Sequence, residues 1–427
     1  MGVLDVFLIV FFVLLLVGTP IAYSLGIASV AFLIFRTDLP GLYVVQKMFA
    51  GVDSFPLLAV PFFILAGNLM NGGGVTRRLL DFCNIFVGRF RGGLAAVSIV
   101  GSMIFAGISG SAAADASGLG SILIPTMNDQ GYEKEYSSAI NATSSTIAML
   151  IPPSIPMVLL ATIASASVRD LFFSSAVAGV LSGLSMLVIN AYLSLKRHYP
   201  RNGKVEGREI PRLVLKCLPS VIMPALILCA IVFGWMTATE ASCLAVIYAL
   251  FTGTFIYKQL TPKKIFQAFI DAAIQTAVVM LIVAAASLLS SLMSYLLLPQ
   301  IIADWALVHL HSHWSMLAVV AVTALVCGCF MDVSPALILL GAIFSPVIKT
   351  MGIHVLQFGA VLCLSLSVGL YTPPVGLTLI ISSKIAGSKI MRDFRFCVPF
   401  LIPELILIML LIMFPVLSVG LPSVMFG

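Results

Sequence analysis

Ala148-Met149-Leu150-Ile151-Pro152-Pro153-Ser154 and its counterpart Gly369-Leu370-Tyr371-Thr372-Pro373-Pro374-Val375 are the two stretches that decide the fold. They lie 221 residues apart, and the same spacing carries Gly107, Pro125 and Gly131 onto Gly328, Pro346 and Gly352. Proline removes a backbone donor and breaks helices. Backbone that leaves a helix at membrane depth persists only where it lines a protein cavity. A duplicated set of helix breakers in an apolar chain therefore predicts a duplicated site in a membrane carrier.

Composition places the chain in a bilayer. It is 60% hydrophobic and 9% charged, with a mean hydropathy of +1.14, whereas a soluble domain carries roughly 25% charged residues. The net charge of +6 lies mostly in short loops, which indicates membrane topology and argues against a nucleic-acid partner. The eight cysteines are scattered, as expected of small core residues. The first apolar run, Val6 to Val17, has no basic residue before it, so we expect a retained segment and not a cleaved signal peptide.

Apolar stretches of spanning length, about 20 residues, follow one another along the chain. We expect them at 4–35 with a pinch at Gly18-Thr19-Pro20, 44–75, 94–127, 137–168, 171–195, 217–234, 240–257, 266–298, 314–348, 355–386 and 396–419. The stretches 94–127 and 314–348 are too long for one crossing and have small or polar residues in the middle. Each is predicted to be a re-entrant hairpin, and 137–168 and 355–386 to be helices broken at the proline pairs.

Basic residues predict that the two halves are inverted. Arg77, Arg78, Arg89 and Arg91 precede the first hairpin, whereas 299–314, the equivalent stretch before the second, has no Lys or Arg. By the positive-inside rule these segments face opposite sides. The loop 196–216 has seven basic residues, 258–264 three and 384–395 four, and all three fall on the inner side in this topology. The acidic loop Glu133-Lys134-Glu135 should lie there too, and both termini on the outer face.

The proline pairs deprive two carbonyls in each copy of their helical donors. These are the carbonyls of Ala148 and Met149 in the first copy and of Gly369 and Leu370 in the second, where Thr372 adds a hydroxyl. A bare carbonyl in hydrocarbon is costly, whereas several oxygens converging on a hard cation satisfy both parties. Sodium is therefore the predicted coupling ion, and no other cofactor is expected.

The hairpin tips supply the opposing groups. They are Ser109, Gly110 and Ser111 in the first hairpin, and Gly328, Asp332 and Ser334 in the second. Half-helix ends at these tips would attract a carboxylate, although small residues there could also serve only to pack hairpin against helix. Asp332 has two possible roles. It could bind a cation or relay a proton, or it could cap the hairpin tip by accepting backbone N–H bonds.

Other readings belong to other classes of protein. Gly107-Ile108-Ser109-Gly110 fits the G-x-S-G of intramembrane serine proteases, but every histidine falls in a predicted loop, where it cannot act as a base. His309, His311 and His313 alternate in an outer loop and could bind a metal. Glu240 begins a segment and could cap it. No G-x-x-x-x-G-K-[ST] motif for ATP occurs.

Several stretches together resemble the large membrane subunit of tripartite ATP-independent periplasmic (TRAP) transporters. They are Asp53-Ser54-Phe55-Pro56-Leu57-Leu58-Ala59-Val60-Pro61-Phe62-Phe63, Ala66-Gly67-Asn68-Leu69-Met70, Ser109-Gly110-Ser111-Ala112, Ile124-Pro125-Thr126-Met127, Gly131-Tyr132, Ile151-Pro152-Pro153-Ser154-Ile155 and Thr372-Pro373-Pro374-Val375-Gly376. Their order and spacing carry the resemblance, which covers nearly the whole chain.

The resemblance implies an all-α polytopic membrane protein, an inverted-repeat, elevator-type transporter with two re-entrant hairpins and two broken helices. It further implies sodium-coupled import of an organic acid such as sialic acid, a dicarboxylate or a sugar acid. A periplasmic binding protein would deliver the acid, and a small four-helix membrane subunit would be the partner in the bacterial inner membrane. Ser109, Gly110, Ala148, Met149, Ile151 and Pro153 would form one sodium site, Gly328, Asp332, Gly369, Thr372 and Pro374 the other, with Ser111, Ser154 and Thr372 near the substrate.

The expected domains follow from that assignment. Residues 1–93 are expected to form scaffold helices, and residues 94–168 the first hairpin and broken helix. Residues 169–313 would form connecting and scaffold helices together with the basic loop. Residues 314–386 would form the second hairpin and broken helix, and residues 387–427 a C-terminal helix.

Overall fold

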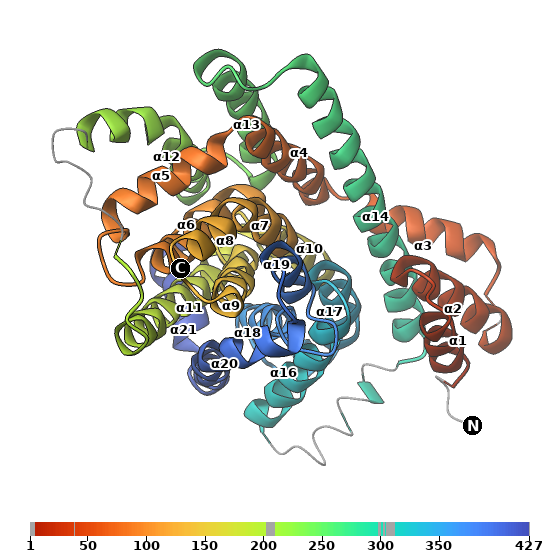
Figure 1. Cartoon of the computed structure of the whole chain (residues 1–427). Coiled ribbons are helices and arrows are strands. Elements are labelled where there is room, and N and C mark those ends of the chain that lie inside the picture. Colours follow the sequence, from red (N-terminus) through yellow and green to blue (C-terminus); the bar gives the residue numbers. More distant parts are fainter. Residues whose placement is uncertain are drawn as a thin grey trace.

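The computed structural model describes residues 5–37, 39–201, 210–297, 300, 301, 304 and 312–426, and within these residues it is helical throughout (Figure 1). The first half contains α1 (Asp5–Leu16), α2 (Ile21–Arg36), α3 (Leu42–Val52), η1 (Phe55–Leu58), α4 (Ala59–Gly72), α5 (Val75–Val87), α6 (Gly93–Ser109), α7 (Ala112–Gly118), α8 (Gly120–Asp129), α9 (Lys134–Ser144), η2 (Ser145–Met149), α10 (Ile155–Ala164) and α11 (Val168–Lys196). The second contains α12 (Ile210–Val232), α13 (Ala238–Phe251), η3 (Thr252–Ile256), α14 (Pro262–Tyr295), α16 (His313–Phe330), α17 (Val333–Thr350), α18 (Val355–Gly369), α19 (Leu377–Ala386), α20 (Ile390–Met413) and α21 (Val416–Phe426).

Both hairpins and both broken helices form where the sequence places them. α6 turns at Gly110, whose φ of +54° is the left-handed conformation that glycine tolerates, and Ser111 caps α7. α16 turns into α17 at Met331 and Asp332. The first broken helix is α9 and η2, then α10 after the prolines, and the second is α18 and α19. The Pro152-Pro153 and Pro373-Pro374 peptide bonds are both cis.

The repeat is visible in the helix boundaries and in the packing. Adding 221 to the residue numbers of α6, α9 and α10 gives the ranges of α16, α18 and α19, to within a few residues. α10 packs against α17 of the other repeat, while α19 packs against α7 and α8. Each broken helix thus supports the hairpin of the opposite copy, as expected of two units related by a two-fold axis.

Contacts between loops establish that the repeats run in opposite directions. Arg197 pairs with Glu133, and Arg201 forms a backbone bridge with Arg91, which brings the acidic loop and the basic linker to one face. The C-terminal end of α19 joins that face, since Ser383 lies 3.5 Å from Ser138 near the start of α9.

The end of the first broken helix lies at the opposite face. There Lys349, at the end of α17, donates to the carbonyl of Ala164 at the end of α10, 2.6 Å away. The first broken helix therefore runs from the basic face to the other, and the second runs back. The inverted arrangement predicted from the basic residues is confirmed.

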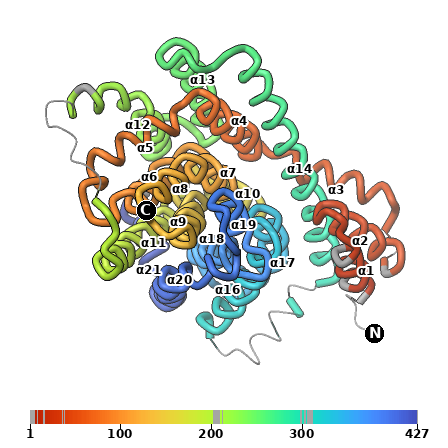
Figure 2. The backbone as a smooth tube through the Cα atoms, viewed as in Figure 1, coloured from red at the N-terminus to blue at the C-terminus, as the bar shows by residue number. Residues whose placement is uncertain are grey.

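The helices form two groups, which we call the frame and the core (Figures 1 and 2). The frame consists of α1–α5 and α12–α14, residues 5–87 and 210–295, and the core of α6–α11 and α16–α21, residues 93–196 and 313–426. α14 has 34 residues and is about 50 Å long. It packs against α2, α3 and α4 and also touches α17 of the core. α11, the connecting helix at the start of 169–313, packs against α6, α18, α20 and α21.

Eight described helical stretches are long and apolar enough to cross a membrane. They are Phe55–Gly72, Val168–Lys196, Leu213–Val232, Ala238–Ile256, Pro262–Tyr295, His313–Phe330, Val333–Thr350 and Ile390–Met413. The expected stretch 44–75 is divided, because α3 ends at Val52 and the chain re-enters through η1 with Pro56. Each piece of the broken helices is shorter than a membrane span. The first interruption is buried in the core, whereas the second is partly exposed at Pro374 and Val375.

We predict that Gly369→Ala prevents the second hairpin from seating on α18. A Cβ at Gly369 would lie 2.5 Å from the backbone carbon of Gly328, a contact that neither backbone can relieve. The yield of monodisperse protein and its melting temperature should fall sharply. Gly26→Ala is the matched control, since its Cβ would meet the Ala285 Cβ at an ordinary 3.8 Å. Equal stability of the two variants would contradict the packing described here.

Candidate functional site

A cavity of about 340 Å³ lies where both hairpin tips, the first broken helix and two frame helices converge. Its lining includes Ser109, Gly110, Ser111 and Ala114 from the first hairpin, Asp332, Ser334 and Pro335 from the second, Met149 and Ile155 from the first broken helix, Ile64, Gly67 and Asn68 from α4, and Ile274, Gln275, Val278, Val279 and Ile282 from α14. Residues more than 200 positions apart are thus brought to one partly open cavity at the boundary between frame and core.

The first tip is held against the first break by close backbone packing. A Cβ on Gly110 would lie 3.0 Å from the carbonyl oxygen of Pro153, so only glycine allows this approach. The hydroxyl of Ser109 accepts from the backbone N–H of Ser111 at 3.4 Å. Ser109 and Ser111 line the cavity, and the Pro153 carbonyl packs against Gly110 between them.

The second tip is held in the same manner. Gly328 packs on Gly369, and the carbonyl of Cys329 accepts from the backbone N–H groups of Val375 and Gly376, each at 3.2 Å. Asp332 caps α17 by accepting from the N–H of Val333 at 2.8 Å, and it also lines the cavity. The two readings of Asp332 are therefore compatible, because one carboxylate oxygen can cap the helix while the other faces the cavity.

Protein donors reach three of the carbonyls that the prolines were predicted to free. Met149 accepts from the hydroxyl of Ser154 at 2.6 Å and from the thiol of Cys363 at 3.3 Å. Gly369 accepts from the N–H of Thr372 at 2.9 Å, and Leu370 from the N–H and hydroxyl of Thr378, both at 3.0 Å. A carbonyl oxygen has two lone pairs, so that of Gly369 keeps one for a cation, whereas those of Met149 and Leu370 would have to exchange a donor for an ion.

The predicted site residues fall into two groups. Ser109, Gly110, Ser111, Met149 and Asp332 line the cavity. Ala148, Pro153 and Ser154 are buried behind it, and Ile151 is half-buried. The lining, as far as the described residues define it, does not include Gly328, Gly369, Thr372 or Pro374, which lie at the second break. The hydroxyl of Thr372 donates to the carbonyl of Val368 at 2.9 Å, and Pro374 is exposed.

Two polar residues of the lining were not predicted from the sequence. Asn68 on α4 has a buried side-chain nitrogen without a hydrogen-bond partner, and Gln275 lies on the face of α14 that includes Val278 and Ile282. Each is a polar residue within an apolar stretch of the sequence, and this pattern could have identified both as candidate site residues. They provide amide donors on the frame side of the cavity.

The ionisable chemistry of the cavity is acidic. Asp332 is the ionisable group among the described lining residues, and these include no Lys or Arg. A carboxylate could therefore enter only if hydrogen-bond donors and bound cations compensated its charge.

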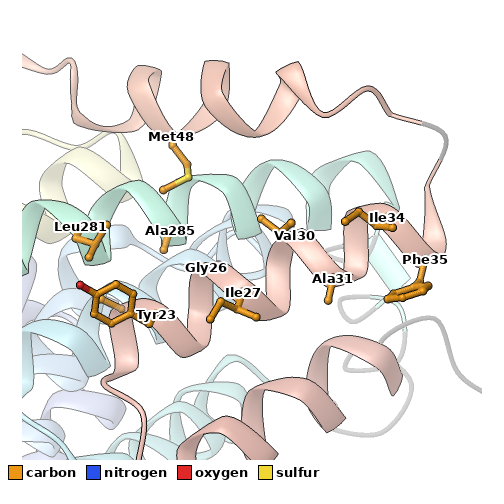
Figure 3. Close-up of a pocket in the computed structure, with 11 residues that line it drawn as sticks. Tyr23, Gly26, Ile27, Val30, Ala31, Ile34, Phe35, Met48, Leu281 and Ala285 are labelled. Atoms are coloured by element: carbon orange, nitrogen blue, oxygen red, sulfur yellow. The ribbon is translucent and has the colours of Figure 1, made fainter.

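A larger cavity, about 460 Å³, lies within the frame between α2 and α14. Figure 3 shows Met48 of α3 and Leu281 and Ala285 of α14 facing the row of α2 residues from Tyr23 to Phe35. Apart from the Tyr23 hydroxyl, its side chains are apolar, so it lacks the oxygen ligands that a cation needs.

The remaining candidates have structural roles or lie outside the described residues. Glu240 forms a capping box with Thr237, accepting from its N–H at 2.7 Å, so the capping interpretation is confirmed. His309 and His311 lie outside the described residues, and His313 begins α16. The eight cysteines are free.

Comparison with known proteins gives a consistent result along the whole chain. The family described as the DctM component of the tripartite ATP-independent periplasmic transporter matches residues 8–417. The sialic acid TRAP transporter large permease protein SiaM of Vibrio cholerae is 34% identical over 97% of this chain and 97% of its own length. The C4-dicarboxylate TRAP transporter large permease protein DctM of Rhodobacter capsulatus is 32% identical over 96% of this chain and 97% of its own.

The fold is also that of a solved transporter. The crystal structure of the YdaH transporter of Alcanivorax borkumensis, described as having an unusual topology, superimposes with a TM-score of 0.68 over 96% of this chain and 98% of that one. The sequence identity is 14%, so this similarity concerns the fold alone.

Proposed function

Because the chain belongs to the DctM family, the large permeases of tripartite ATP-independent periplasmic transporters, we propose that it imports an organic acid by sodium-coupled, elevator-type movement of the core. As a large permease it is a transporter subunit and not an enzyme, and it works with a small membrane subunit and a periplasmic binding protein. We place it in the bacterial inner membrane with both termini on the outer face.

The charge of the cavity is the observation that carries the sodium proposal. Relatives are named for sialic acid and for C4-dicarboxylates, and both are carboxylates. Asp332 would repel such an anion, and the described lining offers no basic side chain to attract it. Cations bound at the tips would reverse the local charge and complete the anion site. Binding of each ligand would then favour binding of the other, which is the basis of coupled transport.

Each proposed sodium site combines one hairpin tip with the proline break beside it. One sodium would lie among Ser109, Gly110 and the carbonyls of Ala148, Met149, Ile151 and Pro153, and the other among Gly328, Asp332, Gly369, Thr372 and Pro374. Small residues already bring each tip within backbone contact of its own break. The Thr372 hydroxyl donates its hydrogen to the Val368 carbonyl, which leaves its oxygen lone pairs for an ion.

The acid would bind between these ions. Ser111 and Ser334 offer hydroxyls from the two tips, and the unpartnered amide nitrogen of Asn68 offers a donor from the frame. Donors from both frame and core suit a carboxylate that must be released when the two groups move apart. We therefore assign the substrate to the carboxylic acids, the class that includes sialic acid, dicarboxylates and sugar acids.

Movement of the core against the frame is supported by where the hydrogen bonds lie. Within the frame, Lys264 reaches the carbonyl of Gly72 and Thr239 that of Phe55. Within the core, Asn141 donates to Ser382 and Ser174 to the carbonyl of Leu356. Around the cavity the frame presents mainly apolar side chains of α4 and α14 to the tips. Such a surface can slide without leaving polar groups unpaired.

A proton-coupled carrier with Asp332 as the relay is the second candidate, because Asp332 faces the cavity. Thermal stability of the purified complex of large and small subunits separates the two. At fixed pH and ionic strength, sodium should raise the melting temperature and potassium should not, since a ligand of the native state stabilises it. Thr372→Ala and Asp332→Asn should each raise the half-effective sodium concentration about tenfold, equivalent to about 1.4 kcal/mol.

Asp129→Asn, an exposed change on α8, is the matched control and should leave the sodium response intact. Equal stabilisation by both cations, together with a response to pH that Asp332→Asn abolishes, would replace sodium by the proton. If Thr372→Ala lowered folded yield and sodium response to the same extent, the residue would be structural.

We predict that a cross-link between frame and core stops uptake. A Cβ at Gly67 on α4 would lie 3.9 Å from the Ser109 Cβ, within the range of a disulfide. Because Ser109 is a proposed sodium ligand, the reduced Gly67→Cys/Ser109→Cys protein should have lowered but measurable uptake; oxidation should abolish that remainder, and saturating substrate should change the rate of cross-linking.

The pair Gly26→Cys/Ala285→Cys is the control, because its predicted Cβ separation is 3.8 Å but both residues belong to the frame. Single-cysteine variants report the background. Full uptake by the oxidised frame–core pair, or a cross-linking rate unaffected by substrate, would contradict movement of the core.

A further inference from the structure

A second polar site lies inside the first hairpin, away from the cavity. Asp115 on α7 is fully buried, and neither of its carboxylate oxygens has a hydrogen-bond partner. The ion pairs among the described residues join Arg169 to Asp170 and Arg197 to Glu133, so Asp115 is part of neither. A buried carboxylate with no compensation is strongly unfavourable, and the position therefore requires a proton or a cation.

A chain of three buried hydroxyls from α6 and α9 leads toward this carboxylate. The hydroxyls of Ser98 and Ser144 are 3.2 Å apart, and that of Ser102 donates to Ser144 at 3.3 Å. Ser102 is the member of the chain next to Asp115, beyond hydrogen-bond distance of its oxygens. Because the Ser102 hydrogen is directed to Ser144, its oxygen lone pairs remain available. The carboxylate and hydroxyls together form a set of hard oxygen ligands between α6, α7 and the end of α9.

The site is separate from the cavity at the tips. Ala114 lines that cavity, whereas Asp115, the next residue on α7, projects about 100° around the helix axis. Ser98 and Ser102 lie two to three turns before Ser109 on α6. The first hairpin therefore carries one oxygen cluster at its tip and another between its arms.

We propose that Asp115, with Ser98, Ser102 and Ser144, binds one sodium ion that is additional to the ions at the hairpin tips. One carboxylate neutralises one monovalent charge. A divalent ion would leave a buried excess charge, and the described residues contain no cluster of three or more His, Cys, Asp or Glu side chains that could balance it. The inference rests on sodium being the coupling ion of the proposed function.

The position of the ion gives it a structural consequence. Ser144 ends α9 directly before η2 and the first break. On the other side of Asp115, the carbonyl of Ala116 accepts from the side chain of Asn141 at 2.9 Å, and Asn141 also donates to Ser382 on α19 at 2.8 Å. An ion at Asp115 would fix the first hairpin against its broken helix and against the opposite repeat. It would thereby set the position of the Ser109–Ser111 tip.

Equilibrium binding of radioactive sodium to the purified complex of large and small subunits tests the proposal. Asp115→Asn preserves the shape of the side chain and removes its charge, so the complex should bind one sodium fewer than the wild type while eluting as a monodisperse species. Asp332→Asn changes the tip site and should retain the Asp115 site. Asp129→Asn, at an exposed position, should bind as the wild type does.

Ser102→Ala provides a second variant if Asp115→Asn does not fold, and it should weaken one class of sodium several-fold. Ser121→Ala, an exposed serine whose hydroxyl bonds to the Gly118 carbonyl, is its control. Wild-type sodium stoichiometry in Asp115→Asn, or unchanged affinities in Ser102→Ala, would overturn this site alone. A wild-type complex that binds no sodium would overturn both this site and the sodium coupling proposed above.

Discussion

Backbone carbonyls that lose their helical donors inside an apolar interior are the constraint on which the structure depends. Pro152, Pro153 and their repeats create these groups at mid-core, and each unsatisfied carbonyl at membrane depth is costly. Ser154, Cys363, Thr372 and Thr378 supply donors to three of these carbonyls, and the small hairpin tips pack in backbone contact with the breaks. Gly110 against Pro153 and Gly328 against Gly369 are the contacts that make this approach possible.

The inverted repeat brings the tips of both hairpins to one cavity. Because one broken helix runs from the basic face and the other toward it, their tips meet near the middle, where frame helices α4 and α14 close the space. The resulting pocket has side-chain oxygens from both copies, and its described lining has an acidic residue and no Lys or Arg. A pocket with this chemistry accepts an acid when cations accompany it, and its location at the boundary of frame and core suits transport by relative movement of the two.

The architecture could be predicted because glycine and proline act locally. Their 221-residue spacing predicted both hairpins and both breaks, and the basic residues predicted the inversion that the Arg197–Glu133 and Lys349–Ala164 contacts confirm. The detailed use of the freed oxygens could not be predicted in this way. Whether the Ser154 hydroxyl turns to Met149, or that of Thr372 to Val368, depends on rotamers set by packing.

The cavity-lining residues of the frame helices could not be predicted from the sequence for a related reason. Asn68 and Gln275 face the cavity only because α4 and α14 pack around the core, and no local pattern gives the rotation of a helix that is apolar on most sides. Asp115 is similar, since Ser102 comes from α6 and the elements packed on α7 include η2 and α19. Polar residues at membrane depth are costly, so their presence in the sequence indicates functional positions even where their partners cannot be predicted.

The most direct measurement is an experimental density map of the complex of large and small subunits, determined in sodium with the transported acid. Density for the acid is expected in the cavity between Ser109–Ser111 and Asp332–Ser334, with density for ions in contact with the hairpin tips and the proline breaks. An acid bound elsewhere, with the two tips apart and both proline breaks closed into continuous helices, would contradict this expectation.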